Sequence, residues 1–206
     1  MDSTPLITVP MPTVTGRETY LAAAVKSYTE TANTEVLVYT DLDGCGAGWA
    51  QGIAEGTGEY FHMGADDVEM HPGWWQAAKR VIDYGFLPAA RILNTDGTLQ
   101  SCGRWGEELP DGMMLSGPDD FTRAPTFSRA QWEKLQPLVE PFLRLGTHYY
   151  TDNIFTWAGN KVGIPTVVCR GFEYTHHLAD VKRGAGMSWQ DRMGHDHRLF
   201  IEYINS

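Results

Sequence analysis

Two adjacent carboxylates, Asp66 and Asp67, follow a short apolar stretch at residues 60–63 and precede a helix that is expected to begin near Pro72. Carboxylates at the carboxyl end of a buried strand lie where open α/β sheets bind their ligands. Their hard oxygens suit Mg²⁺ or Mn²⁺, and such ions usually hold the phosphates of a substrate. A plain polar turn between a strand and a helix also contains such acids, so the surrounding elements decide between a turn and a site.

The first 85 residues alternate apolar strands with amphipathic helices. Strands are predicted at residues 5–10, 35–40 and 60–66. Helices are predicted after Thr15, which forms a capping box with Glu18, around residues 49–55, and over residues 72–84. This βαβαβα order predicts a mainly parallel sheet with right-handed crossovers and with helices on its faces.

The second half of the chain has a different pattern. Asp96-Gly97 is typical of a hairpin turn, and residues 107–123 are expected to form a surface loop rich in Gly, Pro and Asp. Ser128 is a predicted helix cap, and further elements are a helix at 151–162, a strand at 164–174 and a closing helix at 188–204. Residues 179–187 are expected to be mobile.

Composition limits the class of protein. The chain has 206 residues, enough for a single domain, in which we expect a nucleotide-binding half at 1–85 and an acceptor-binding and catalytic half at 86–206. The formal charge of −10 and the lack of a Lys/Arg run disfavour non-specific binding to nucleic acid or to anionic membranes. Three widely spaced cysteines indicate reduced thiols in a cytoplasmic protein, and the sequence shows neither a signal peptide nor a membrane span.

Four stretches of the chain resemble a GT-A fold glycosyltransferase of the family 2 type: ITVPMPTVTGRETYLAAAVKSY, VLVYTDLDG, AQGIAEGTGEYFHMGADDVEMHPGWW and ILNTDGTLQSCG. The resemblance implies an α/β, Rossmann-like single domain with a mixed, mainly parallel sheet flanked by helices. It also implies a metal-dependent, inverting hexosyltransferase. One departure matters, because Gly64 replaces the first acid of the family's usual Asp-x-Asp motif and leaves Gly64-Ala65-Asp66-Asp67.

The resemblance further implies a divalent cofactor, Mn²⁺ or Mg²⁺, with Asp66 as its primary ligand and Asp67 beside it. Family members often supply another metal ligand from a late histidine, and His176 and His177 follow a predicted strand. Since neighbouring residues of a strand face opposite ways, only one of the two is expected to point inward, and we favour His176. A histidine pair at a strand end can equally have no ligand role.

Donor binding is assigned by the resemblance mainly to the loops after the first two strands. Asp41 lies where the family's acidic residue meets the nucleobase, and its carboxylate could accept the N3–H of uracil. Lys182 and Arg183 could close over the diphosphate and exclude water, although two solvated surface cations are the simpler interpretation. The predicted donor-binding residues are Thr13, Arg17, Asp41, Asp43, Ala65, Asp66, Lys182 and Arg183.

Asp152 is the candidate general base. Inverting family members place this carboxylate at the start of a late helix, and Thr151-Asp152-Asn153 precedes an apolar helical pattern. An aspartate in this position is also a common helix cap with no catalytic role. For the acceptor, Trp74 and Trp105 are the predicted aromatic platform, although most tryptophans serve packing.

The sequence therefore predicts transfer of a sugar from a nucleotide-sugar, a UDP-sugar in the first instance, to an unidentified hydroxyl acceptor. The acceptor could be a glycan, a protein, a small molecule or a modified base. Two other functions stay open at this point. One is a degenerate protein that binds a nucleotide-sugar without transferring it, and the other is a metal-dependent phosphohydrolase.

Overall fold

The first three strands and one later strand form a four-stranded sheet. The computed structural model describes residues 7–101, 105–108, 113–116, 123–177 and 188–206. Its first elements are β1 (Ile7–Thr13), α1 (Glu18–Thr31), β2 (Thr34–Thr40), α2 (Gly44–Glu55) and β3 (Tyr60–His62). β1 pairs in parallel with β2 and β3, and β9 (Thr126–Ser128) adds an antiparallel edge. The carboxyl ends of β1, β2 and β3 therefore meet at one edge of this sheet, where α/β proteins bind ligands.

A second sheet is built around the long strand β10 (Thr166–His176). β10 pairs in parallel with β5 (Leu87–Leu93) and antiparallel with β4 (Val68–Met70) and β8 (Met113–Ser116). The two edges of the sheet are β6 (Leu99–Ser101) and β7 (Trp105–Glu108). Asp96-Gly97 turns the chain between β5 and β6, as predicted, with Gly97 at a φ of 79°.

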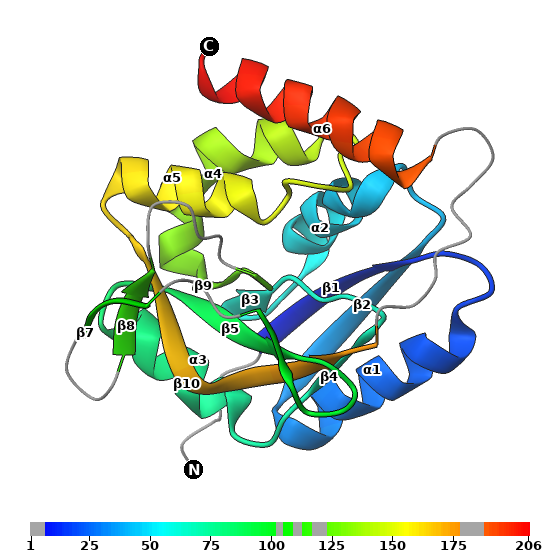
Figure 1. Cartoon of the computed structure of the whole chain (residues 1–206), viewed down its shortest axis with the longest axis vertical. Coiled ribbons are helices and arrows are strands. Elements are labelled where there is room, and N and C mark those ends of the chain that lie inside the picture. Colours follow the sequence, from blue (N-terminus) through cyan, green and yellow to red (C-terminus); the bar gives the residue numbers. More distant parts are fainter. Residues whose placement is uncertain (1–6, 102–104, 109–112, 117–122, 178–187) are drawn as a thin grey trace.

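Helices lie on both sides of the two sheets (Figure 1). The helices of the second half are α3 (Trp74–Asp83), α4 (Arg129–Leu143), α5 (Asn153–Val162) and α6 (Trp189–Ile204). α4, α5 and α6 lie together on one side, and α1 and α3 lie on the other (Figure 1). Phe200 and Tyr203 of α6 pack on Phe142 of α4, which fixes the last helix against the rest of the protein. The mixed α/β class with flanking helices is confirmed.

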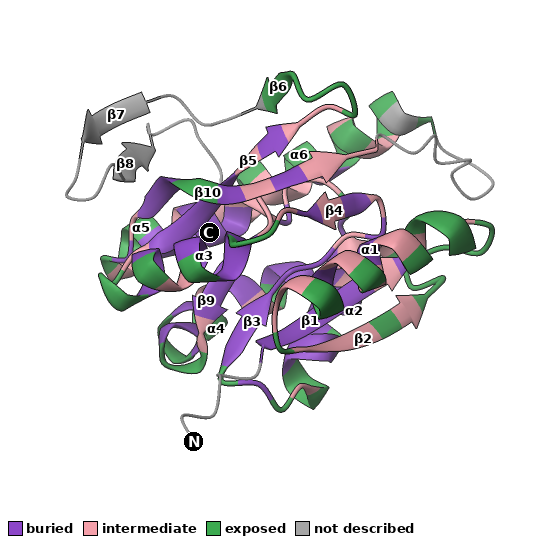
Figure 2. Cartoon of the chain, turned by 90° about the horizontal axis from the view of Figure 1, so that it is seen from below, coloured by how far each residue is buried: buried purple, intermediate pink, exposed green. Residues whose placement is uncertain are grey.

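Buried side chains form two clusters, one between α1, α3, β1 and β10 and the other between α2, α4, α5 and β3. Figure 2 shows that β1 and β3 are almost entirely buried, whereas β2 at the edge of the sheet is partly exposed. His62 on β3 is fully buried and bonds the hydroxyl groups of Tyr28 and Thr126 at 3.0 and 2.8 Å. Burial lowers the pKa of His62 to about 3, so the imidazole is neutral and serves as a core residue.

Several predicted elements need correction. The predicted capping box at Thr15 is wrong: the N-cap of α1 is Arg17, and Thr15 bonds Asp41 instead. The third strand ends at His62 rather than Asp66, and β4 follows before α3 begins at Trp74. The predicted surface loop at 107–123 contains β8 and the end of β7. The capping box at Ser128 is confirmed, and residues 179–187 lie outside the described part of the chain.

In the part of the chain that the structure describes, no helix combines the length and the apolar character needed to cross a membrane.

Candidate functional site

A cavity of about 1630 Å³ opens at the carboxyl ends of β1 and β2 and just beyond β3. Residues 148–153 and the start of α6 line the cavity beyond these strand ends, and the end of β10 lines it beside Asp67. The predicted site residues that line this cavity are Thr13, Arg17, Asp41, Asp43, Ala65, Asp66, Asp152 and His176. Residues that are far apart in the sequence, including the predicted general base and the predicted donor ligands, therefore face one space.

Asp66 is the most buried of the carboxylates that line the cavity, with 4% of its surface exposed. The Thr13 hydroxyl donates to Asp66 Oδ2 at 2.6 Å, and an Arg17 guanidinium nitrogen lies 3.1 Å from Oδ1. Burial raises the pKa of Asp66, and the Thr13 hydrogen bond and the Arg17 charge oppose this rise. Both oxygens of Asp66 are thus in contact with the loop that follows β1.

Asp67 lies between two basic side chains. The same Arg17 nitrogen is 2.8 Å from Asp67 Oδ2, and His176 Nε2 is 3.5 Å from that oxygen. Burial alone would raise the pKa of Asp67, but the hydrogen bonds and charges of His176 and Arg17 lower it to about 2. Asp67 is therefore ionised at neutral pH.

The chemistry of Asp66, Asp67 and His176 suits Mn²⁺, which accepts carboxylate and imidazole ligands. Their arrangement does not suit it, because the Arg17 guanidinium bridges the two carboxylates. Over the described ranges no group of three or more His, Cys, Asp or Glu side chains is placed to hold a metal ion. The side chains as arranged do not fit the metal, and a metal cofactor stays a prediction.

Gly64 is the position at which the sequence resemblance led us to expect an acid, and the packing around it leaves little space for a side chain. A Cβ atom at this position would lie 2.7 Å from Val9 Cγ1 and 3.1 Å from the Pro10 carbonyl oxygen. The backbone here is also tied on both sides, since Gly64 N–H donates to Pro10 O and Gly64 O accepts from Trp49 Nε1. A side chain at position 64 would therefore require Val9 or the Pro10 backbone to shift.

Asp41 and Asp43 follow β2 at the rim of the cavity. Asp41 has a φ of 56° and accepts from the backbone N–H and the hydroxyl of Thr15, at 3.0 and 2.6 Å. These two hydrogen bonds lower the pKa of Asp41 and keep its carboxylate ionised. Asp43 is exposed, and its Oδ1 lies 3.5 Å from Arg192 of α6.

Asp152 is the N-cap residue of α5, and its side chain accepts from the Asn153 N–H at 3.0 Å. Burial raises the pKa of Asp152, and the nearby positive charge of Arg123 opposes this rise. A raised pKa makes a carboxylate a stronger proton acceptor. The residue that the sequence assigned as general base thus combines a place on the cavity wall with an environment that favours proton transfer.

Five other predicted residues have different outcomes. His177 faces away from the cavity toward Glu69, with 2.9 Å between Nε2 and Oε1, so His176 is the inward histidine of the pair. Trp74 is fully buried against Tyr28, His62 and Phe172, and its assignment to the acceptor is wrong. The side chain of Trp105, and Lys182 and Arg183 entirely, lie outside the described residues.

Among the comparisons with known proteins, only solved structures resemble this chain. No family model matches the chain, and no curated protein matches it. The solved structures that resemble it include the crystal structure of S. aureus TarS, with a TM-score of 0.59, 12% identity and 98% of this chain covered. The structure of S. aureus TarS residues 1–349 gives a TM-score of 0.60 and 13% identity, again over 98% of this chain. This chain shares the fold of TarS. It spans 43% of the longer TarS chain and 71% of the shorter one.

The sequence did not single out several residues that line the same cavity. Arg123 precedes β9, and Cys45 lies at the start of α2. Tyr150 has a φ of 64°, which is rare for a residue other than glycine, and Arg192 lies on α6. The Arg192-x-x-x-Asp196 spacing was the available signal for α6, but a charged pair at this spacing is also typical of a solvated helix face.

Proposed function

We propose that this protein is a glycosyltransferase that moves a sugar from a nucleotide-sugar donor to a hydroxyl acceptor, with inversion. One observation supports this most directly: a single cavity is lined by the acids that follow β2 and β3 and, on another wall, by Asp152. The sequence motifs of the family 2 type and the fold shared with the glycosyltransferase TarS point the same way. A UDP-sugar is the first donor to test.

In this proposal Asp152 accepts the proton of the acceptor hydroxyl. The hydroxyl oxygen then forms a bond to the anomeric carbon of the donor, while the bond from that carbon to the diphosphate breaks. The nucleoside diphosphate leaves with the bonding electrons. The raised pKa of Asp152 favours the proton transfer, and Arg17 and Arg123 line the cavity as positive groups for the diphosphate.

Asp41 and Thr13 are proposed to meet the nucleoside. Both oxygens of Asp41 already accept from Thr15, but each carboxylate oxygen has a further lone pair for the N3–H of a uracil. The hydroxyl of Thr13 donates a hydrogen bond to Asp66, which links the proposed nucleoside site to Asp66 and Asp67. The donor would therefore lie along the ends of β1 and β2, with its anomeric carbon toward Asp152.

A donor screen tests the proposal. Purified protein is titrated by calorimetry with UDP, GDP, CDP and ADP, with and without Mn²⁺, and a panel of nucleotide-sugars is then incubated with acceptors and read by mass spectrometry. We expect one nucleoside diphosphate to bind and its sugar to appear on an acceptor. Binding with neither transfer nor donor hydrolysis would favour a nucleotide-sugar-binding protein, and phosphate release from simple phosphoesters would favour a phosphohydrolase.

A further inference from the structure

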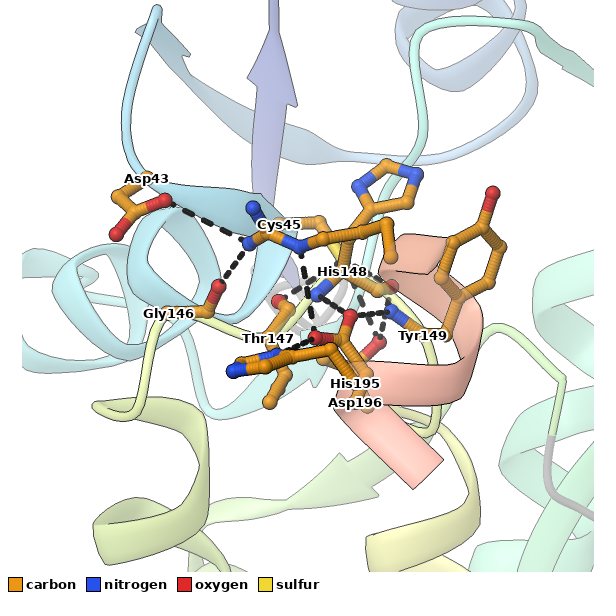
Figure 3. Close-up of polar contacts among 10 residues, drawn as sticks. Asp43, Cys45, Gly146, Thr147, His148, Tyr149, His195 and Asp196 are labelled. Carbon is orange, nitrogen blue, oxygen red and sulfur yellow. Dashed lines mark hydrogen bonds and ion pairs between the residues drawn. The ribbon is translucent and has the colours of Figure 1, made fainter. Parts of the chain in front are cut away.

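Asp196 of α6 is a carboxylate with no exposed surface, and it lies beside the loop that leads to Asp152. Its Oδ2 accepts from the backbone N–H groups of His148 and Tyr149 at 2.8 and 2.9 Å (Figure 3). A buried carboxylate that binds two successive backbone N–H groups holds that backbone in one conformation. The contact joins residues 48 positions apart in the sequence.

The second oxygen of Asp196 is also in contact. Its Oδ1 lies 3.1 Å from His195 Nδ1 and 3.4 Å from Arg192 Nε. Burial would raise the pKa of Asp196, but the hydrogen bonds of Tyr149, His195 and His148 and the charge of Arg192 lower it. Asp196 is therefore ionised at neutral pH, and both of its oxygens serve the same small cluster.

Arg192 extends this cluster to the donor side of the cavity. Its guanidinium donates to the Gly146 carbonyl oxygen and lies 3.5 Å from Asp43 Oδ1 (Figure 3). The loop meets the start of α2 as well, where Gly46 N–H donates to Thr147 O at 3.1 Å. The segment from Gly146 to Tyr149 is thus held between α6 and the first turn of α2.

The segment held in this way carries Asp152 three residues further on. Between them, Tyr150 adopts its left-handed backbone conformation and stacks on Phe200 of α6 at 5.4 Å between ring centroids. Thr151 is buried and lies 3.3 Å from Cys45 Sγ. Tyr150 and Thr151 are closely packed and Tyr150 is strained, so a displacement of residues 146–149 should also displace Asp152.

We propose that Asp196 and Arg192 are positioning residues for transfer: they fix residues 146–151 and thereby hold Asp152 at the reacting hydroxyl. The inference rests on the proposed function. Packing of α6 does not require this ion cluster, since Phe200 and Tyr203 contact Phe142, and the Tyr203 hydroxyl donates to Leu138 O at 3.0 Å. A displacement of about 1 Å in a catalytic group is enough to cost roughly 100-fold in rate.

The test compares Asp196→Asn with Tyr203→Phe. The first keeps the size of the side chain but removes its charge, and the second removes a different hydrogen bond of α6, far from the cavity. We expect Asp196→Asn to lower the transfer rate by about 100-fold while the Kd for the nucleoside diphosphate changes less than threefold. Tyr203→Phe should leave both values unchanged. Equal loss of rate and affinity in Asp196→Asn, or equal loss of rate in both variants, would overturn the positioning role.

Cys45 supplies a readout that does not depend on activity. Its thiol donates to His148 O at 3.0 Å, and burial raises its pKa to about 12, so a thiol reagent should label it slowly. We expect faster labelling of Cys45 in Asp196→Asn, assigned by peptide mass spectrometry, and unchanged labelling in Tyr203→Phe. Faster labelling with a wild-type transfer rate would overturn the inference. A wild-type protein that binds no nucleoside diphosphate would instead overturn the proposed function, while the labelling would still test the contact.

Discussion

On the wall formed by β1, β2 and β3, polar side chains bind one another: Arg17 contacts Asp66 and Asp67, and Thr13 donates to Asp66. On the opposite wall, Asp196 binds backbone N–H groups and holds a loop. The first kind of contact can be exchanged for contacts to a ligand, because the same side chains can turn to it. The second kind fixes a backbone path that a ligand does not replace.

This difference teaches where each effect of mutation should appear. Substitutions on the wall of β1, β2 and β3 should change the affinity for the donor or for ions, since its side chains are the proposed binding groups. Substitutions on the wall of residues 146–152 should change the rate at nearly constant donor affinity, since that wall is proposed to position Asp152.

The largest expected effect belongs to Asp152. Asp152→Asn keeps the size of the side chain and removes its ability to accept a proton, so transfer should fall by about 10²–10⁴-fold. Donor affinity measured by calorimetry should stay within about threefold, because the base contacts the acceptor and not the diphosphate. Asparagine is as good an N-cap residue as aspartate, so thermal unfolding should register little loss of stability. Near-normal transfer in this variant would remove Asp152 from the mechanism.

The Gly64→Ala variant tests the packing of Gly64 against β1. Gly64→Ala should lower the free energy of unfolding in urea by about 1–3 kcal/mol, because the added methyl group meets Val9 and the Pro10 carbonyl oxygen. Gly194→Ala is the matched control: Gly194 lies within α6, and a Cβ there would meet only Arg198 at 3.9 Å. The control should gain about 0.5–1 kcal/mol. A fully stable Gly64→Ala would mean that the missing acid has no steric cause.

The Arg17→Ala variant tests whether a metal ion can bind at Asp66 and Asp67. If Mn²⁺ binds at Asp66, it must displace the guanidinium that bridges the two carboxylates. Arg17→Ala should then bind Mn²⁺ about tenfold more tightly than the wild type in a donor-free titration, which corresponds to about 1.4 kcal/mol. The double variant with Asp66→Ala should lose this gain. Equal Mn²⁺ affinity in Arg17→Ala and the wild type would place any metal elsewhere.

The smallest effect is a shift in the pH profile. Arg123 opposes the rise in the pKa of Asp152, so Arg123→Gln should raise that pKa further. A base is inactive when protonated, and the acidic limb of the rate profile should therefore move to higher pH, by about half a unit to one unit. Arg144→Gln removes the same charge at an exposed site beside Glu140 and should leave the profile in place. A shift to lower pH would contradict the assignment.

Much of the wall formed by β1, β2 and β3 could be predicted because its residues follow successive parallel strands. The apolar strands and the acids after them, Asp41 and Asp66, are local patterns, and parallel pairing brings their ends together. The prediction for Thr15 failed because a neighbouring acceptor competed with the helix end: Asp41, in a left-handed conformation, takes both the N–H and the hydroxyl of Thr15.

The opposite wall could be predicted only in part. Asp152 has a local signal, a polar residue before an apolar helix, but Asp196 lies in the middle of a helix among His and Arg, where a solvated face is the usual interpretation. Its role depends on a loop 48 residues earlier, and no local pattern contains that pairing. The prediction for Trp74 failed because the aromatic residues that bury it come from β3, α1 and β10, which are distant in the sequence.

The bonds from His148 and Tyr149 to Asp196 also have a consequence for dynamics. Backbone amides in loops usually exchange their hydrogens with solvent quickly, whereas these two donate to a carboxylate with no exposed surface. Their exchange should require α6 to separate from the loop. Deuterium uptake at these amides should therefore be slow, and its rate should match that of the amides in the turn of α6 around Phe200. The C-terminal helix would then set the timescale on which the segment beside Asp152 opens.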